Sequence, residues 1–233
     1  MILQNSQKNI IITGAGKGIG FELTKLLCTQ HRVLAISRNT DSLDALAREN
    51  SNCIALSRDI TDENLKSKLE KEIKAQFKRV DILINNAGFL VNKPFTEITR
   101  GEMLAVYTTN VIGLMEICQT VIPWMSTGAH IVNIGSMGGF QGSTKFPGLS
   151  VYSSSKAAVA GFTECLAEEL KQEHISVNCL ALGAVQTEML SAAFPEFKAP
   201  VTALEMARFI AEFALTGNQY FNGKVLPVSS TTP

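Results

Sequence analysis

The sequence predicts an α/β domain in which a doubly wound parallel sheet of about seven strands is covered by helices on both faces. Short β-rich runs recur along the chain, amphipathic segments of helical length separate them, and a glycine-rich turn directly follows the first run. Strands that alternate with helices are typical of βαβ units, whose parallel strands are buried on both faces. We therefore expect a single domain over residues 1–233.

The expected strands are short runs rich in Val, Ile and Leu, at residues 8–13, 32–37, 53–57, 81–85, 130–135, 176–182 and 224–228. Residues 99–102, "TRGE", have the pattern of a capping box, which predicts that a helix begins there. Pro123 is expected near the end of the apolar helix before the fifth strand. Residues 228–233 are expected to form a frayed tail.

The composition excludes several classes of partner. Lys plus Arg is 21 and Asp plus Glu is 21, so no net charge attracts the chain to nucleic acid or to an anionic membrane, and a small-molecule partner is expected. No signal-like start and no window long enough to span a bilayer is found, which predicts a soluble, cytoplasmic protein. The five cysteines are scattered without C-x-x-C spacing, so we expect buried free thiols and no metal site.

A glycine-rich turn, "TGAGKGIG" at residues 13–20, lies between the first strand and the first helix. Without side chains at Gly14, Gly18 and Gly20, a pyrophosphate can approach the backbone N–H groups and the positive end of the helix. Such glycines can also serve only a turn or a close helix contact. Their place after the first strand favours dinucleotide binding.

A tyrosine and a lysine four residues apart, Tyr152 and Lys156, share one face of a predicted helix. They follow "NNAG" at residues 85–88, Asn110 and Ser136. With these five motifs in this order, the sequence resembles the short-chain dehydrogenase/reductase family over almost its whole length. The resemblance implies a Rossmann fold and an NAD(P)-dependent oxidoreductase.

The resemblance also implies a role for each residue of the tetrad. Tyr152 would protonate the carbonyl oxygen, Ser136 would hydrogen-bond the same oxygen, and Asn110 would organise a water-linked proton path. Lys156 would hold the nicotinamide ribose, and its charge is expected to lower the pKa of the phenol. Taken singly, each residue has a plainer interpretation, such as a helix start or a solvated face. Ser136 stands sixteen residues before Tyr152, a longer segment than the family suggests, so Ser143 is a rival for the serine role.

The cofactor is predicted to be NADP(H) in preference to NAD(H). The second strand ends at Ser37 and Arg38 without a carboxylate, and Lys17 is a second cation that can reach a 2′-phosphate. Leu182 precedes Gly183 where the family usually has proline. The cofactor-binding residues that the resemblance implies are Gly14, Lys17, Gly18, Ile19, Gly20, Ser37, Arg38, Asp59, Ile60, Asn86, Ala87, Gly88, Tyr152, Lys156, Gly183, Val185 and Thr187.

The substrate pocket is expected to be apolar, although several of its side chains can instead belong to the core. A short lid is expected after Leu190. Segments 121–130 and 167–174 hold one cation among several acids, which argues against an acyl carrier protein as partner. The predicted pocket residues are Met137, Phe140, Phe146, Met189, Leu190, Phe194 and Phe197.

Together these features predict an NADPH-dependent reductase of a small, mostly apolar ketone or aldehyde, or the reverse alcohol oxidation. One alternative is a 3-oxoacyl reductase, which would need a basic docking surface. Another is a non-catalytic NADP(H)-binding redox regulator, which would have no use for an activated phenol. The resemblance also implies a homodimer or homotetramer, and the apolar run 111–125 fits either an interface or a core helix.

Overall fold

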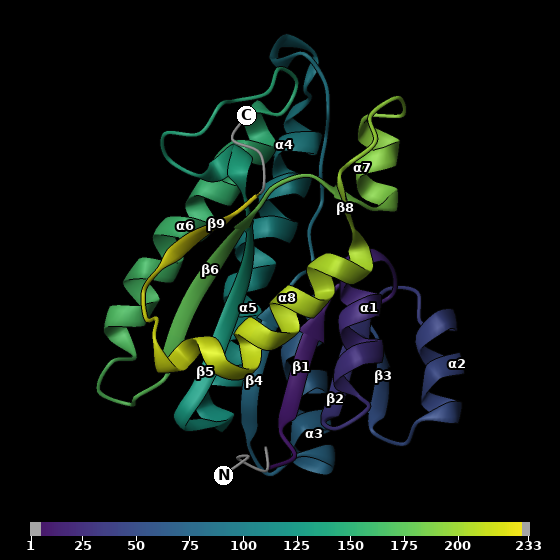
Figure 1. Cartoon of the computed structure of the whole chain (residues 1–233), viewed down its shortest axis with the longest axis vertical. Coiled ribbons are helices and arrows are strands. Elements are labelled where there is room, and N and C mark those ends of the chain that lie inside the picture. Colours follow the sequence, from purple (N-terminus) through teal and green to yellow (C-terminus); the bar gives the residue numbers. More distant parts are fainter. Residues whose placement is uncertain (1–5, 230–233) are drawn as a thin grey trace.

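A single seven-stranded parallel sheet organises the computed structural model, which describes residues 6–229 (Figure 1). The strand order is β3-β2-β1-β4-β5-β6-β9. All seven predicted strands are confirmed, and the fifth begins earlier than expected. The strands are β1 (Asn9–Thr13), β2 (Arg32–Ser37), β3 (Cys53–Ser57), β4 (Val80–Asn85), β5 (Met125–Ser136), β6 (Ser176–Leu182) and β9 (Val225–Val228).

The order of the strands reverses beside β1, because β2 and β4 pair with its two edges. In doubly wound sheets the crevice at such a reversal, at the carboxyl ends of the strands, is where ligands bind. Thr13 and Asn85 are paired at this point. The topology therefore places the glycine turn and the N-N-A-G segment side by side.

Helices cover both faces of the sheet, as predicted (Figure 1). Alternate residues of β1 point to opposite faces: Ile10 and Ile12 belong to one buried cluster and Ile11 to the other. Each such fully buried side chain contributes about 1.5–3 kcal/mol to stability. Helices α1 (Gly18–Leu27), α2 (Asp41–Glu49) and α8 (Ala203–Thr216) cover one face, and α3 (Leu65–Gln76), α5 (Gly113–Val121) and α6 (Ser150–Glu169) cover the other.

Smaller elements complete the carboxyl end of the sheet. Helix α4 (Arg100–Tyr107) packs on α6 and continues through a π-helical turn, Thr108–Ile112, into α5. The segment after β6 forms β7 (Val185–Gln186), the short helix α7 (Glu188–Ala193) and β8 (Val201–Thr202). Single 3-10 turns lie at Phe95–Glu97, Ile122–Trp124, Met137–Gly139 and Gly217–Gln219.

The predicted helix boundaries around α4 and α5 are confirmed. Thr99 Oγ1 accepts a hydrogen bond from the Glu102 N–H at 3.2 Å, and Glu102 Oε2 accepts one from the Thr99 N–H at 2.9 Å. This reciprocal pair is a capping box. Pro123 lies in the 3-10 turn that follows α5.

Two expectations, about the tail and about the cysteines, need correction. Val228 pairs with Leu182 as the last residue of β9 and is not frayed; residues 230–233 of the predicted tail lie outside the described residues. Four cysteines are buried free thiols as expected, but Cys165 is exposed on α6.

The helical run Arg100–Trp124 is long and apolar enough to cross a membrane, so the expectation that no such window exists is wrong. Half of its most apolar window is buried inside the structure, and buried core helices pass the same test of length and composition. The run is therefore weak evidence for a membrane span. The cytoplasmic location stays a prediction.

Candidate active site

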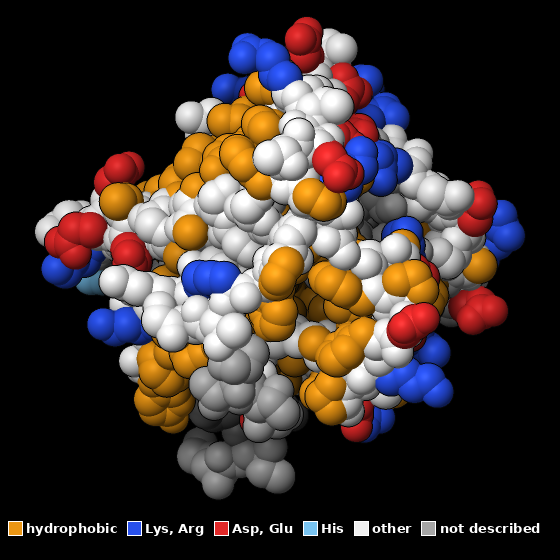
Figure 2. Space-filling view, turned by 90° about the horizontal axis from the view of Figure 1, so that it is seen from above, with side chains coloured by type: hydrophobic (Ala, Val, Ile, Leu, Met, Phe, Trp, Pro, Cys, Tyr) orange, Lys and Arg blue, Asp and Glu red, His pale blue; other side chains and the backbone are white. Residues whose placement is uncertain are grey.

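A cavity of about 890 Å³ opens at the carboxyl end of the sheet. Figure 2 views the molecule from this end and shows a hollow rimmed by hydrophobic side chains. Every cofactor-binding residue predicted above lines this cavity except Gly20. The predicted binding residues, which are far apart in the sequence, are thus brought together.

The glycine turn is shaped by positions that tolerate no side chain. Gly14 and Gly18 have φ values of +66° and +55°, in the left-handed region that favours glycine. A Cβ added at Gly20 would lie 2.2 Å from the Gly14 carbonyl oxygen and 2.5 Å from Asn86 Nδ2. That nitrogen donates to the carbonyls of Thr13 and Gly14, both at 3.1 Å. Gly20 therefore acts by letting α1 approach the turn closely.

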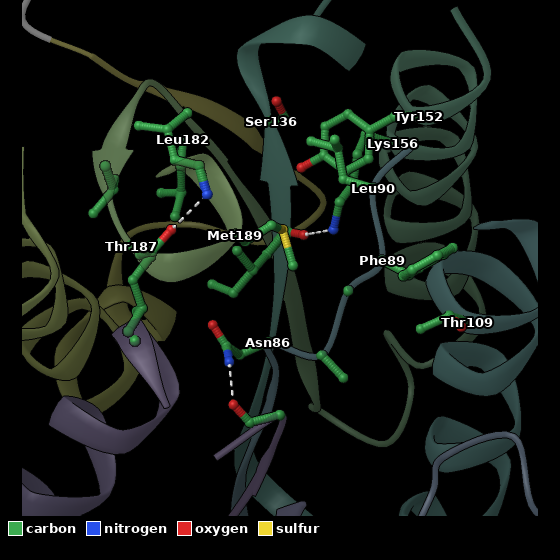
Figure 3. A pocket seen from close by; sticks show the side chains of 18 of the residues that line it. Asn86, Phe89, Leu90, Thr109, Ser136, Tyr152, Lys156, Leu182, Thr187 and Met189 are labelled. Atoms are coloured by element: carbon green, nitrogen blue, oxygen red, sulfur yellow. Dashed lines mark hydrogen bonds between the residues drawn. The ribbon is translucent and has the colours of Figure 1, made fainter. Parts of the chain in front are cut away.

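Ser136, Tyr152 and Lys156 lie together on one side of the cavity (Figure 3). Ser136 ends β5, and Tyr152 and Lys156 belong to the first turns of α6. The Lys156 Nζ donates to the Ile134 carbonyl at 2.7 Å and lies 5.9 Å from the centre of the Tyr152 ring. Burial lowers the pKa of Lys156 to about 8, and the nearby Cys179 opposes this shift.

The phenol of Tyr152 behaves differently from the expectation. Burial raises the pKa of Tyr152, and a side-chain hydrogen bond with Ser136 opposes the rise. The expected lowering of this pKa by Lys156 is therefore not seen, because loss of solvent outweighs other effects at this depth. In this state the phenol is a proton donor at neutral pH.

The lengthened segment before α6 separates the two candidate serines. Ser136 lines the cavity and its Oγ accepts from the Gly138 N–H at 3.1 Å. Ser143 does not line the cavity; its hydroxyl, which has one proton to donate, lies 2.9 Å from the Phe140 carbonyl oxygen and also within hydrogen-bond reach of the Met137 carbonyl. Lys145 Nζ donates in turn to Ser143 Oγ at 2.9 Å. Ser143 thus holds the loop together, and Ser136 is the serine beside Tyr152.

Asn110 is fully buried in the π-helical turn and does not line the cavity. Its Oδ1 accepts from the Phe89 N–H at 2.7 Å, and its Nδ2 donates to the Phe89 carbonyl and to Ser155 Oγ, both at 2.9 Å. Ser155 Oγ donates to the Tyr152 carbonyl at 2.7 Å. These bonds tie the loop after β4 to the start of α6. Asn110 thereby fixes the backbone on both sides of the cavity.

The part of the cavity beyond Ser136 is apolar, as expected for a substrate pocket. The prediction that Phe140 belongs to the pocket needs correction, because Phe140 does not line the cavity. Gly139 packs against the backbone of α6, where a Cβ would lie 2.5 Å from the Ala157 nitrogen, so the chain turns away after Gly138. The other predicted pocket residues, Met137, Phe146, Met189, Leu190, Phe194 and Phe197, line the cavity.

The sequence reasoning missed several apolar lining residues. Phe89 and Leu90 directly follow the N-N-A-G segment, and this position is a signal that could have identified them. Leu104 and Leu149 also line the cavity, but their neighbours in the sequence do not mark them.

The other end of the cavity is charged. Lys17, Ser37, Arg38 and Asp59 line it, and Arg38 Nη1 lies 3.8 Å from Asp59 Oδ2. The Arg38 side chain is 77% exposed, so this ion pair is weak. Arg58 lines the same region and was not identified from the sequence.

The comparisons with known proteins agree with this geometry. Residues 8–197 match the model of the short chain dehydrogenase family. The chain is 34% identical over 229 residues to carbonyl reductase family member 4 of Danio rerio, covering 94% of each chain. It is 31% identical over 241 residues to the 3-oxoacyl-[acyl-carrier-protein] reductase FabG of Thermotoga maritima, covering 95% of this chain and 96% of that one. The solved structure of ElxO with NADP bound superposes with a TM-score of 0.82 at 28% identity, covering 95% of this chain and 97% of the other.

Proposed function

Because the chain belongs to the short chain dehydrogenase family, we propose that it is an NADPH-dependent carbonyl reductase acting on a small, mostly apolar ketone or aldehyde. The observation that carries the proposal is the placement of Ser136 and Tyr152 beside the buried Lys156 in a cavity with an apolar end. A protein that only senses NADP(H) needs the glycine turn but has no use for these hydroxyls.

The cavity suits a dinucleotide. An added Cβ at Gly14 would lie 2.7 Å from the Ala87 Cα, and one at Gly20 would lie 2.2 Å from the Gly14 oxygen, so both glycines let the turn pack closely against the N-N-A-G segment and α1. The N-terminus of α1 then provides backbone N–H groups for a pyrophosphate. Lys17 and Arg38 would lie at the adenosine end, and Lys156 at the nicotinamide ribose. When bound, the reduced nicotinamide supplies a hydride to the carbonyl carbon.

The side chains of this protein would handle the proton and the developing charge. The Tyr152 phenol, protonated at neutral pH, donates its proton to the carbonyl oxygen as that oxygen becomes an alkoxide. Ser136 Oγ donates a second hydrogen bond to the same oxygen. The ammonium of Lys156, held by the Ile134 carbonyl, stabilises the negative charge that remains on Tyr152.

The preference for NADPH rests on charge at the adenosine end. Lys17 and Arg38 line the cavity there, and a 2′-phosphate would gain charge-assisted hydrogen bonds from them. The similar structure of ElxO holds NADP, which supports the same choice. One such bond, discounted for exposure, corresponds to a tenfold to hundredfold preference, on the order of 1.4–2.8 kcal/mol.

The test is an assay of purified protein with ketones, aldehydes, diketones and acyl thioesters, following oxidation of NADPH and of NADH. We expect apolar ketones or aldehydes to be reduced, with kcat/KM for NADPH exceeding that for NADH. Arg38→Asp should reverse this preference by repelling the phosphate. Absence of turnover with every carbonyl would contradict the activity, and equal use of both cofactors would contradict the preference.

A 3-oxoacyl reductase is the second candidate, supported by the similarity to the FabG protein of Thermotoga maritima. The charge argument against a carrier protein fails. Segment 121–130 contains the amino end of β5, and segment 167–174 contains the carboxyl end of α6. The two segments lie together, because the Gly128 N–H donates to the His174 carbonyl. Both lie on the order of 30 Å along β5 from Ser136. The two candidates are separated by measuring kcat/KM for the same 3-oxoacyl group attached to acyl carrier protein and attached to a short thiol. A carrier-dependent enzyme would strongly prefer the form on acyl carrier protein.

We also propose that the protein is a homodimer or homotetramer. Tyr107 at the end of α4 and Ile112 in the π-helical turn are exposed, by 38% and 48%, and neither lines the cavity. An apolar surface on neighbouring helices suits a self-complementary contact. Sedimentation analysis of the parent and of Ile112→Glu tests this, and a monomeric parent would contradict it.

A further inference from the structure

Arg58 occupies a distinctive place at the charged end of the cavity. It follows β3 directly, and its backbone N–H donates to the Ser37 carbonyl at 2.8 Å, which ties it to the end of β2. Ser57 Oγ donates to the Arg38 carbonyl at 3.1 Å. The ends of the two strands are thus held together, and Arg38 and Arg58 line the same region.

The guanidinium of Arg58 has a donor left over. Its Nη1 donates to the Ser57 carbonyl at 2.6 Å, but its Nε is buried and has no hydrogen-bond partner among residues 6–229. Within the same residues Arg58 forms no ion pair, whereas Arg38 shares its charge with Asp59. A buried donor on a charged group is costly to leave unsatisfied, and native structures rarely do so without a ligand or a water.

We propose that Arg58 binds the 2′-phosphate of NADP(H) and is a determinant of cofactor choice together with Arg38. A guanidinium presents several N–H donors in a planar fork, which fits the oxygens of a phosphate better than a ribose hydroxyl. The Nε is covered in this structure, so the side chain would have to turn to present it to the phosphate, which would also balance two arginines that have one carboxylate between them. This inference rests on the proposed use of NADP(H).

Binding measurements test the proposal without relying on turnover. NADP⁺ and NAD⁺ are titrated by calorimetry into the parent, Arg58→Gln and Arg58→Lys, and 2′,5′-ADP and 5′-AMP serve as the matching fragments. The control is Arg48→Gln, which removes an equal charge from an exposed position on α2 outside the cavity. We expect Arg58→Gln to raise the Kd for NADP⁺ and 2′,5′-ADP about tenfold or more. The Kd values of Arg58→Gln for NAD⁺ and 5′-AMP should stay within about twofold of those of the parent. The Kd of Arg58→Lys for NADP⁺ should lie between the values of the parent and of Arg58→Gln.

Each other outcome is informative. If Arg58→Gln lost affinity equally for NADP⁺ and NAD⁺, or equally for 2′,5′-ADP and 5′-AMP, Arg58 would act by shaping the loop or contacting the adenine. That result would overturn the proposal. No change in either would show that it is a surface cation. A parent that binds NADP⁺ and NAD⁺ equally would overturn the NADPH preference as well. A parent that prefers NADP⁺ with an unaffected Arg58→Gln would overturn this inference alone.

Discussion

The ammonium of Lys156 lies over the ring of Tyr152, 5.9 Å from its centre, while its Nζ donates to the Ile134 carbonyl. Both side chains are held in the same dry region, and burial moves their pKa values in opposite senses. The pKa of Lys156 falls to about 8 and that of Tyr152 rises. As the pH rises, the lysine is therefore the member of this pair that loses its proton first.

The pair predicts the pH dependence of carbonyl reduction. Below the Lys156 pKa of about 8 the lysine is charged and the phenol is protonated, which is the state that the reaction needs. We expect kcat/KM to be nearly constant from about pH 6 to 7 and to fall about tenfold by pH 9, because this ratio reports pKa values of the free enzyme. A profile at constant ionic strength checks this. A value unchanged up to about pH 10 would show that Lys156 stays charged or that its charge does not matter.

Replacing Tyr152 by phenylalanine removes the proton donor and keeps the ring. Turnover should fall by at least about a thousandfold, while the Kd for NADP⁺ changes less than about twofold. The matched control is Tyr220→Phe, which loses the phenol of a residue that is 78% exposed and does not line the cavity. That variant should keep the activity of the parent. Appreciable turnover by Tyr152→Phe would remove Tyr152 from the acid role.

Replacing Ser136 should affect catalysis, whereas replacing Ser143 should affect stability. Ser136→Ala removes a hydroxyl beside Tyr152, and loss of one donor to a developing oxyanion lowers kcat by about a hundredfold. Ser143→Ala removes a hydroxyl that donates to a loop carbonyl, so it should lower the free energy of unfolding by about 1 kcal/mol with kcat little changed. Kinetics and urea unfolding on both variants measure the two effects. A larger kcat loss for Ser143→Ala would reverse the assignment.

The elements that the sequence predicted well are those whose residues are buried on both sides. Strand β1 has an unbroken apolar run, with Ile10, Ile11 and Ile12 fully buried, so its pattern needs no tertiary information. The glycine turn was predictable for a similar reason, because left-handed backbone at Gly14 and Gly18 restricts the choice of residue.

What the sequence could not predict depends on tertiary distances. The π-helical turn at Asn110 has the same local composition as an ordinary helix, and its side chain is engaged by Phe89 across the fold. The raised pKa of Tyr152 follows from burial, which residue spacing does not reveal. Arg58 adjoins the predicted Asp59, but the direction of its side chain toward the cavity is visible only in three dimensions.

The buried side chain of His130 should make the stability of the folded protein depend on pH. His130 Nδ1 lies 3.0 Å from the Ala214 carbonyl, and burial lowers its pKa from 6.5 to about 4. The unfolded chain therefore binds a proton that the folded protein does not, so stability is full above about pH 6.5 and is lost as the pH falls toward 4. This loss is about 3 kcal/mol.

Urea unfolding between about pH 4.5 and 7.5 measures this effect. The pKa of His31 is also lowered by burial and adds in the same direction, so His130→Gln is needed to isolate one contribution. This variant should be less stable at pH 7 but should lose less stability on acidification. Equal pH dependence in the variant and the parent would show that His130 does not titrate in this range.

Two glycines in helices offer a test of the close approach at the cofactor turn. A Cβ at Gly20 would lie 2.2 Å from the Gly14 oxygen, a contact that only movement of the turn can relieve, whereas a Cβ at Gly161 in α6 would meet nothing within 4 Å. Gly20→Ala should weaken NADP⁺ binding at least about tenfold and lower the free energy of unfolding by about 1–3 kcal/mol through overpacking. Gly161→Ala should raise the free energy of unfolding by about 0.5–1 kcal/mol, because alanine is the better helix former, and should leave the Kd for NADP⁺ unchanged. Calorimetric titration and urea unfolding of the two variants give both quantities. If Gly20→Ala bound NADP⁺ as tightly as Gly161→Ala, the turn would be able to yield and the close packing of α1 against Gly14 would not be required for the cofactor.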